Sequence, residues 1–173
     1  MKLSITFKRQ LSYIGMSLLT LLIFLVMTIV AYRYISVSNV RLDMNLGMIL
    51  IPFILFFIWL FFPVFFIHFN YYQVNKDNII YFYSDMQIIR FNQDEYKFSD
   101  IEKIIIHLTG AKRKGDSAHT LLSAEYYYSE ILFNNNKRVI VSCLMADNLL
   151  KTIVKNFPEN IIDYSEEIFP IIK

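Results

Sequence analysis

The sequence predicts an α+β membrane protein with a two-helix transmembrane hairpin followed by a small antiparallel β-barrel or sandwich, which a C-terminal amphipathic helix caps. Composition supports the membrane part, because 55% of the 173 residues are hydrophobic and 18% are charged, against about 45–50% and 25% in soluble domains. The charge is also uneven: residues 1–75 sum to +4 and the other 98 residues to −2. A lipid-compatible first part therefore precedes a water-compatible domain.

The first predicted span covers residues 11–32. The stretch from Gln10 to Tyr32 has 23 residues and no charge. A helix of this length covers about 34 Å, enough for a hydrocarbon core of about 30 Å. A cleaved signal peptide is the alternative, since Lys8 and Arg9 precede the apolar run. The run exceeds the usual 7–15 residues and no small-residue cleavage site precedes Arg33, so we expect a retained helix.

The second predicted span covers residues 46–69. Eight phenylalanines lie between Phe53 and Phe69, and Pro52 and Pro63 interrupt the run. Lipid leaves no partner for free backbone groups, so we expect a helix with kinks at the prolines. Trp59 lies mid-span, away from the interface where Trp is enriched. It is a candidate for packing against the first helix or another subunit, and a lipid-facing ring is the equal alternative.

The connection of residues 33–45 is short, so the two spans should form an antiparallel hairpin within residues 1–70, with both chain ends on one membrane side. Basic residues are slightly more numerous on that side than on the other. The side of the chain ends has Lys2, Lys8, Arg9 and Lys76, and the opposite side has Arg33 and Arg41. The positive-inside rule predicts a multi-pass protein of the inner (cytoplasmic) membrane with cytoplasmic N- and C-termini.

Residues 71–158 form the predicted β domain, with about six or seven strands separated by turn residues. Two strands near its end are joined by residues 134–137, which are rich in asparagine and predict a hairpin. The predicted strands are 71–76, 79–83, 86–91, 101–108, 126–133 and 138–144. Apolar residues then recur at helical spacing over 147–157, where Asp147 can cap the helix and Pro158 ends it.

Residues 159–173 form an apolar tail that contains six isoleucine or phenylalanine side chains. A tail of this composition is poorly solvated by water. Three arrangements remain open: packing on its own domain, addition to a sheet edge, or contact with a neighbouring subunit.

The order of these elements resembles the bacterial pleckstrin-homology-like (PH-like) domains that lie behind a short transmembrane hairpin. The resemblance rests on YYQVNKDNIIYFY from Tyr71, YKFSDIEKIII from Tyr96, EILFNNNKRVIVS from Glu130 and the helix that follows. In that family an aromatic-x-Ser-Asp-Ile turn joins two strands, and Phe98 to Ile101 is similar. The resemblance implies a PH-like fold. The loop of residues 109–122 and the tail depart from the family pattern.

The sequence offers no catalytic constellation, so we predict no catalytic residues, no cofactor, no metal site and no small-molecule substrate. No G-x-S-x-G, H-E-x-x-H or C-x-x-C motif occurs. His68, His107 and His119 are dispersed, and Cys143 lies in an apolar strand where burial keeps a thiol inert. An enzyme is not expected.

Two groups of residues are candidates for contacts. Lys112, Arg113 and Lys114 form a compact basic cluster that can meet lipid headgroups or a protein partner, although a solvated loop is the simpler alternative. Tyr126 and Tyr128 are candidates for protein contact. The acidic balance of the domain argues against nucleic acid.

Two functional hypotheses follow. In the first, the protein is a non-enzymatic membrane protein whose cytoplasmic PH-like domain is a protein-binding or assembly scaffold, with membrane lipids and a protein partner or homo-oligomer as its contacts. In the second, it is a membrane-embedded immunity or pore-associated protein whose hairpin carries the activity. The aromatic second span is the feature that favours the second hypothesis.

Overall fold

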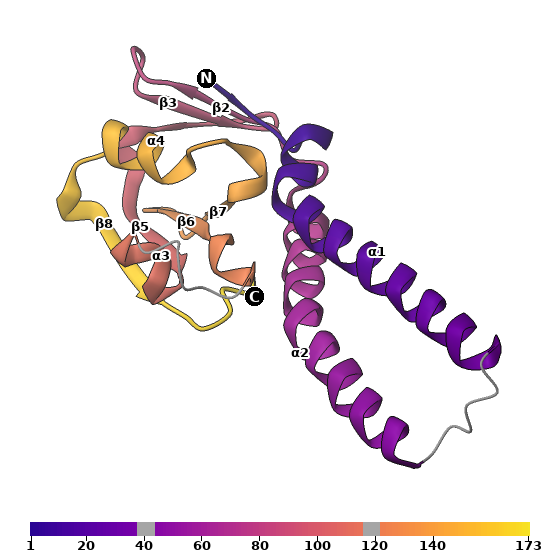
Figure 1. The fold of residues 1–173 in the computed structure, drawn as a ribbon. Coiled ribbons are helices and arrows are strands. Elements are labelled where there is room, and N and C mark those ends of the chain that lie inside the picture. The colour runs from indigo at the N-terminus through magenta and orange to yellow at the C-terminus, as the bar shows by residue number, and fades with distance from the viewer. Residues whose placement is uncertain (38–43, 116–121) are drawn as a thin grey trace.

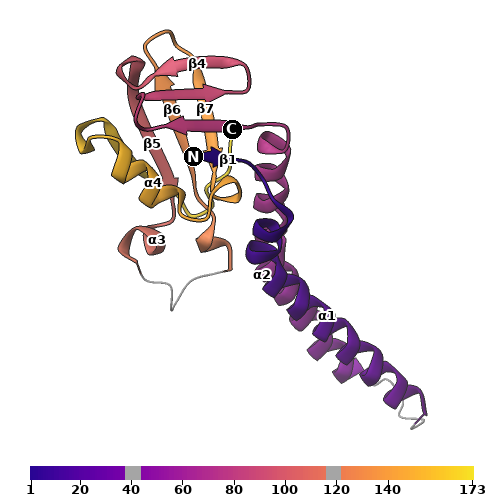
Figure 2. The same ribbon diagram turned by 90° about the horizontal axis from the view of Figure 1, so that it is seen from above.

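The computed structural model describes residues 1–37, 44–115 and 122–173. Two long helices form a hairpin beside a domain of two four-stranded sheets (Figure 1). The strands of the two sheets cross at a steep angle, and the hairpin extends away from one side of the domain (Figure 2). This α+β architecture agrees with the predicted fold class.

The hairpin consists of α1 (Phe7–Val37) and α2 (Met44–Asn75), which run antiparallel (Figure 1). Both are longer than the predicted spans, and α2 remains helical through Pro52 and Pro63. Each is long and apolar enough to cross a membrane, with 6% of the candidate span in α1 buried and 28% of that in α2. Burial this low distinguishes them from the core helices of a soluble protein.

The hairpin is inserted between two neighbouring strands of one sheet. β1 (Lys2–Leu3) precedes α1, and it pairs antiparallel with β2 (Ile80–Tyr83), which follows α2. Leu3 is fully buried in the domain core. The expected boundary that placed all of residues 1–70 in the hairpin is therefore wrong at its start. A two-residue strand has no period that a sequence pattern can show.

The first sheet continues through β3 (Ile88–Phe91) and β4 (Asp94–Lys97), in the order β1-β2-β3-β4. The sequence predicted a turn over residues 92–95, but the turn is tighter and β4 begins at Asp94. Asn92 makes this possible because it takes a left-handed conformation with φ of 55°, which asparagine tolerates well.

The second sheet has the order β7-β6-β5-β8, formed by β5 (Ile101–Leu108), β6 (Tyr128–Phe133), β7 (Arg138–Ser142) and β8 (Ile162–Glu166). The predicted hairpin of β6 and β7 is confirmed by their antiparallel register. β8 lies in the predicted tail and pairs parallel with β5. The tail thus adds to a sheet edge, and the sheet is mixed rather than purely antiparallel.

The predicted amphipathic helix is α4 (Leu149–Asn156), and Pro158 follows its C-cap residue Phe157. Phe157 packs on Phe98 and Phe82, with ring centroids 4.6 and 6.1 Å apart, so this end of α4 closes over the sheets. Asp147 does not cap the helix, because it pairs with Arg9 instead. The remaining short elements are α3 (Gly110–Lys114) and the 3-10 turns η1 (Phe98–Asp100), η2 (Leu122–Glu125), η3 (Cys143–Met145) and η4 (Glu159–Ile161).

Residues 71–75 were expected to start the β domain as a strand, and this is wrong: they are the last turns of α2. One of the two tyrosines there, Tyr71, is fully buried where α2 packs against the second sheet. The side-chain amide of Asn75 donates to the carbonyl oxygen of Ile140 in β7 at 2.9 Å. Packing of the tertiary structure thus overrides the β-preference of the local sequence.

Candidate functional site

The contact between the hairpin and the domain, called the junction below, is formed by the ends of α1 and α2 nearest the domain. Arg9 at the start of α1 holds one side of it. Its guanidinium donates to both carboxylate oxygens of Asp147, at 2.8 and 3.3 Å, and to the backbone oxygens of Ser4 and Met145, each at 2.7 Å. The bond to Asp147 lowers the pKa of that carboxyl. One side chain therefore joins β1, α1 and η3.

Buried aromatic rings fill the other side of the junction. The rings of Tyr71 and Tyr126 lie 5.7 Å apart edge to face, and those of Tyr71 and Tyr128 5.8 Å apart. The Tyr126 hydroxyl is 3.0 Å from Nδ1 of His68. Burial raises the pKa of both Tyr126 and Tyr128, so these hydroxyls stay neutral.

The prediction that Tyr126 and Tyr128 are surface contacts is wrong. Both are fully buried or nearly so. Alternation along a strand does place neighbouring side chains on opposite faces, but here the interior of the domain covers one face while α2 and the C-terminal segment cover the other. No local pattern predicts that α2 continues past its apolar run and packs against a sheet.

Trp59 does not pack against α1. It is 61% exposed, and the ring next to it is Phe56 of its own helix, at 6.4 Å. The contact between the helices at this depth is the stack of Phe24 on Phe57, with centroids 4.1 Å apart. Packing of Trp59 against the first helix is therefore not found, and its ring lies on the outer surface of the hairpin.

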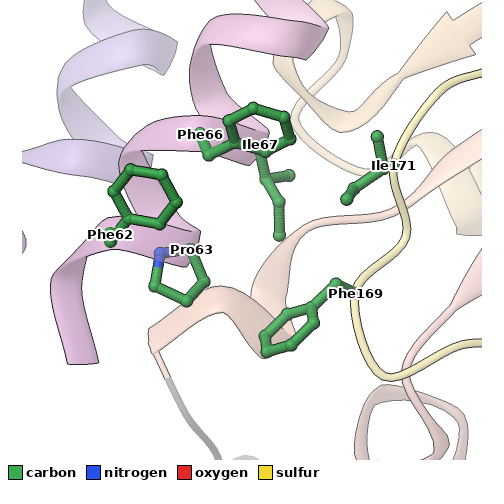
Figure 3. Close-up of a pocket in the computed structure, with 6 residues that line it drawn as sticks. All are labelled: Phe62, Pro63, Phe66, Ile67, Phe169 and Ile171. Carbon is green, nitrogen blue, oxygen red and sulfur yellow. The ribbon is translucent and has the colours of Figure 1, made fainter. Parts of the chain in front are cut away.

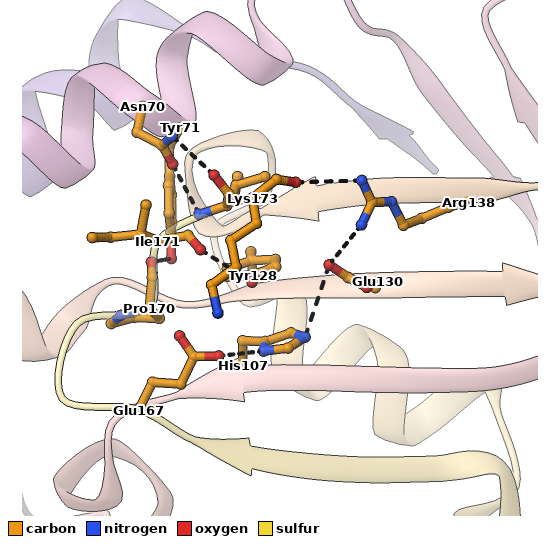
Figure 4. Close-up of polar contacts among 11 residues, drawn as sticks. Asn70, Tyr71, His107, Tyr128, Glu130, Arg138, Glu167, Pro170, Ile171 and Lys173 are labelled. Atoms are coloured by element: carbon orange, nitrogen blue, oxygen red, sulfur yellow. Dashed lines mark hydrogen bonds and ion pairs between the residues drawn. The ribbon is translucent and has the colours of Figure 1, made fainter.

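The backbone of the C-terminal segment, residues 167–173, forms hydrogen bonds with side chains of α2 and of the second sheet (Figure 4). The side-chain amide of Asn70 bonds both backbone groups of Ile172, at 3.0 and 3.1 Å. The hydroxyls of Tyr71 and Tyr128 donate to the carbonyl oxygens of Pro170 and Ile171, at 2.7 and 3.3 Å. Of the three expected arrangements for the tail, packing on its own domain and addition to a sheet edge are both found.

His107 lies beneath this segment between two carboxylates. Its Nδ1 is 2.8 Å from Glu167, its Nε2 is 4.0 Å from Glu130, and its ring stacks on Tyr128 at 4.4 Å (Figure 4). Arg138 also approaches Glu130, at 3.5 Å. His107 is therefore a largely buried structural residue where the C-terminal segment begins.

An apolar crease separates α2 from the C-terminal segment (Figure 3). Its volume is about 270 Å³. The side chains that line it are Phe62, Pro63, Phe66, Ile67, Phe169 and Ile171. All six are hydrocarbon, so the crease suits an apolar occupant. The sequence did not predict it, because it requires the fold to bring together residues about a hundred positions apart.

The basic cluster is less free than its sequence suggests. Lys112 pairs with Glu125, and Arg113 pairs with Glu166 at 2.7 Å. Among the residues that the structure describes, Lys114 has no ion pair. The short helix α3, which Thr109 caps through its side-chain oxygen, thus presents one unpaired cation where three were expected.

The outward face of the first sheet carries an aromatic and charged surface that the sequence analysis missed. Tyr81 and Tyr83 stack on it with centroids 6.1 Å apart. Lys2 lies over Tyr81 and Arg90 over Tyr83, each at 5.9 Å. Alternation in Ile-Tyr-Phe-Tyr over 80–83 was a sufficient signal, since Ile80 and Phe82 are buried and both tyrosines are partly exposed. These four residues and Glu95, paired with Arg90, are called the outer sheet face below.

Cys143 is fully buried, and burial raises its pKa to about 12. The thiol is therefore held protonated, as expected for an apolar position. Of the three histidines, His119 lies outside the described residues, and His68 and His107 lie in separate parts of the structure. Within the described ranges, no group of three His, Cys, Asp or Glu side chains could hold a metal ion.

The fold and the junction define a class: a domain of two crossed sheets with a C-terminal helix, joined to a helical hairpin able to span a membrane. A protein-family model described as a PH domain matches residues 3–152. The chain belongs to the PH domain family. The match begins near β1 and runs across the hairpin into α4, so it includes the insertion. No curated protein and no solved structure matched the chain.

Proposed function

We propose that the protein is a non-enzymatic integral membrane protein of the inner (cytoplasmic) membrane, with both termini in the cytoplasm. Its PH domain is a protein-binding or assembly scaffold. The observation that carries this proposal is the insertion of the hairpin between β1 and β2, with both helices bonded to the domain. A domain attached in this way keeps one orientation to the membrane and presents a fixed face to a partner.

The exposure of the hairpin supports its place in lipid. Large apolar side chains are exposed around both helices, among them Leu22, Val26, Leu55 and Phe62. Water would solvate this surface at a cost of about 25 cal/mol per Å², and monomeric soluble proteins rarely expose apolar patches so extensive. Lipid removes that cost.

The outer sheet face is the surface that we assign to the partner. Two partly exposed tyrosines and an arginine form a surface with both apolar and polar character, and tyrosine and arginine are both enriched at protein interfaces. It belongs to the first sheet, away from the C-terminal segment and α3. Lys114 on α3 is the remaining candidate for contact with lipid headgroups.

A comparison of matched variants tests the scaffold. The double substitution Tyr81→Ser and Tyr83→Ser removes both outward rings, and Tyr164→Ser on β8 removes another exposed tyrosine as a control. Each tagged full-length variant is crosslinked in native membranes and purified in detergent. We expect the wild type and the control to retain the same partner or self-oligomer and the double variant to lose it. Recovery of the unmodified protein only as a monomer would contradict the proposal.

A further inference from the structure

The apolar crease between α2 and the C-terminal segment borders the surface that the hairpin exposes. Phe62 and Phe66 line it from α2, and the same two side chains are exposed on the outside of the hairpin, Phe62 at 64%. Phe169 and Ile171 form its opposite wall. The crease is therefore continuous with the apolar face of a candidate span.

The wall contributed by the C-terminal segment is not a regular helix or strand, yet three of its carbonyl oxygens have hydrogen-bond partners within the protein. Bonds from Tyr71, Tyr128 and Asn70 occupy the carbonyl oxygens of Pro170, Ile171 and Ile172. The amide of Ile172 donates to Asn70, and proline has no amide hydrogen. Irregular backbone is tolerated beside hydrocarbon only when its polar groups have partners within the protein. The carbonyl groups of residues 170–172 meet that condition.

The location of the segment also suits the lipid boundary. In Figure 1 the yellow C-terminal segment runs along the edge of the domain on the side toward which the hairpin extends. Ile168, just before the crease, is 79% exposed. An exposed isoleucine followed by an apolar segment with hydrogen-bonded carbonyl groups suits a domain that rests on a bilayer, because hydrocarbon solvates the isoleucine side chain better than water does.

We propose that the crease holds an acyl chain of a membrane phospholipid. The inference rests on the proposed function, in that the hairpin must lie in the bilayer. Apolar cavities stay dry and accept apolar molecules, and a void deprives its walls of dispersion contacts. Bilayer hydrocarbon is the apolar material that surrounds α2. Because lipid tails are as apolar as the walls, the chain is held by packing contacts and not by the hydrophobic effect.

Photolabelling tests this assignment. The full-length protein is reconstituted in vesicles of phosphatidylethanolamine and phosphatidylglycerol, a fraction of the latter carrying a diazirine on its acyl chain. After irradiation, mass spectrometry maps the adducts. We expect adducts on Phe169 and Ile171 as well as on the exposed stretch of α1 around Val26.

Two variants narrow the crease, and one serves as a control. Ile171→Trp fills the crease from the C-terminal segment. Phe62→Trp fills it from the exposed side of α2, where the protein can accommodate a larger ring. The second variant keeps the test valid if the first fails to fold. Ile168→Trp adds the same ring outside the lining. We expect both filling variants to lose the label on Phe169 and to keep the label on α1, and the control to keep both.

The remaining outcomes separate the two proposals. Label on α1 without label on the C-terminal segment overturns the acyl-chain site and leaves the membrane assignment intact. Label on Phe169 that persists in both filling variants shows only general contact with the bilayer and also overturns the site. Absence of label on α1 overturns the proposed function and this inference with it.

Discussion

Replacement of Arg9 by methionine tests how the domain is fastened to the hairpin. Arg9 is only 19% exposed, and it donates to the carbonyl oxygens of Ser4 and Met145, whereas the side chain of Asp147 is 76% exposed. Hydrogen bonds that involve a charged group contribute about 1.5–3 kcal/mol, and an exposed ion pair about 0.2–1 kcal/mol. We therefore expect Arg9→Met to destabilise the junction by about 3 kcal/mol and Asp147→Asn by about 0.5 kcal/mol.

The assay is hydrogen exchange of the β1, β2 and η3 amides in detergent or nanodiscs, because global unfolding of membrane helices is rarely reversible. Exchange there should rise about a hundredfold in Arg9→Met, since each 1.4 kcal/mol is a factor of ten. Lys8→Met, which alters the exposed neighbouring cation, is the matched control. Equal exchange in the two variants would refute the assigned role of Arg9.

Acid should weaken only part of this contact. Arg9 lowers the pKa of the Asp147 carboxyl below its usual value of 3.8. The stabilisation from a carboxyl of this kind is fully present above the unfolded pKa and is lost as the pH falls through the folded pKa. The difference between the wild type and Asp147→Asn should therefore shrink as the pH falls below 3.8 and vanish once the folded-state carboxyl is protonated, while the larger effect of Arg9→Met persists.

The remaining predictions concern the C-terminal segment, the buried thiol and the tyrosines of the two sheets. Asn70→Ala should free the backbone of the C-terminal segment and speed its amide exchange about tenfold or more, whereas Gln73→Ala, on the exposed side of α2, should not. Cys143, with its pKa raised to about 12, should resist maleimide at pH 8 until the protein is unfolded. Tyr128→Ala should destabilise the domain by about 3–5 kcal/mol and Tyr81→Ala by about 1 kcal/mol or less, measured by hydrogen exchange of the strand amides; similar effects would contradict the burial described above.

Much of the fold could be predicted because it depends on local patterns. The strand predicted over 101–108 is β5, the asparagine-rich turn identified the hairpin of β6 and β7, and helical spacing identified α4. The composition also predicted both long helices, although each is longer than its predicted span. Each of these features depends on one continuous stretch of the chain.

The features that were missed all depend on contacts between distant parts of the chain. β1 is two residues long and becomes a strand only because β2, nearly eighty positions later, pairs with it. Tyr126 and Tyr128 are buried because α2 and the C-terminal segment cover a face that a strand pattern leaves open. Asp147 was expected to cap α4, but Arg9 competes for its carboxylate. No local pattern contains this information.

The central claim is that the hairpin lies in lipid while the domain stays in water at its base, and thiol accessibility tests it most directly. Single cysteines at Val26, halfway along α1, and at Met86, exposed on the domain, are introduced with the unreactive Cys143 left in place. In inside-out membrane vesicles, a charged thiol reagent should modify the cysteine at 86 and leave the one at 26 unmodified until detergent is added. Equal modification at both positions in intact vesicles would contradict the account.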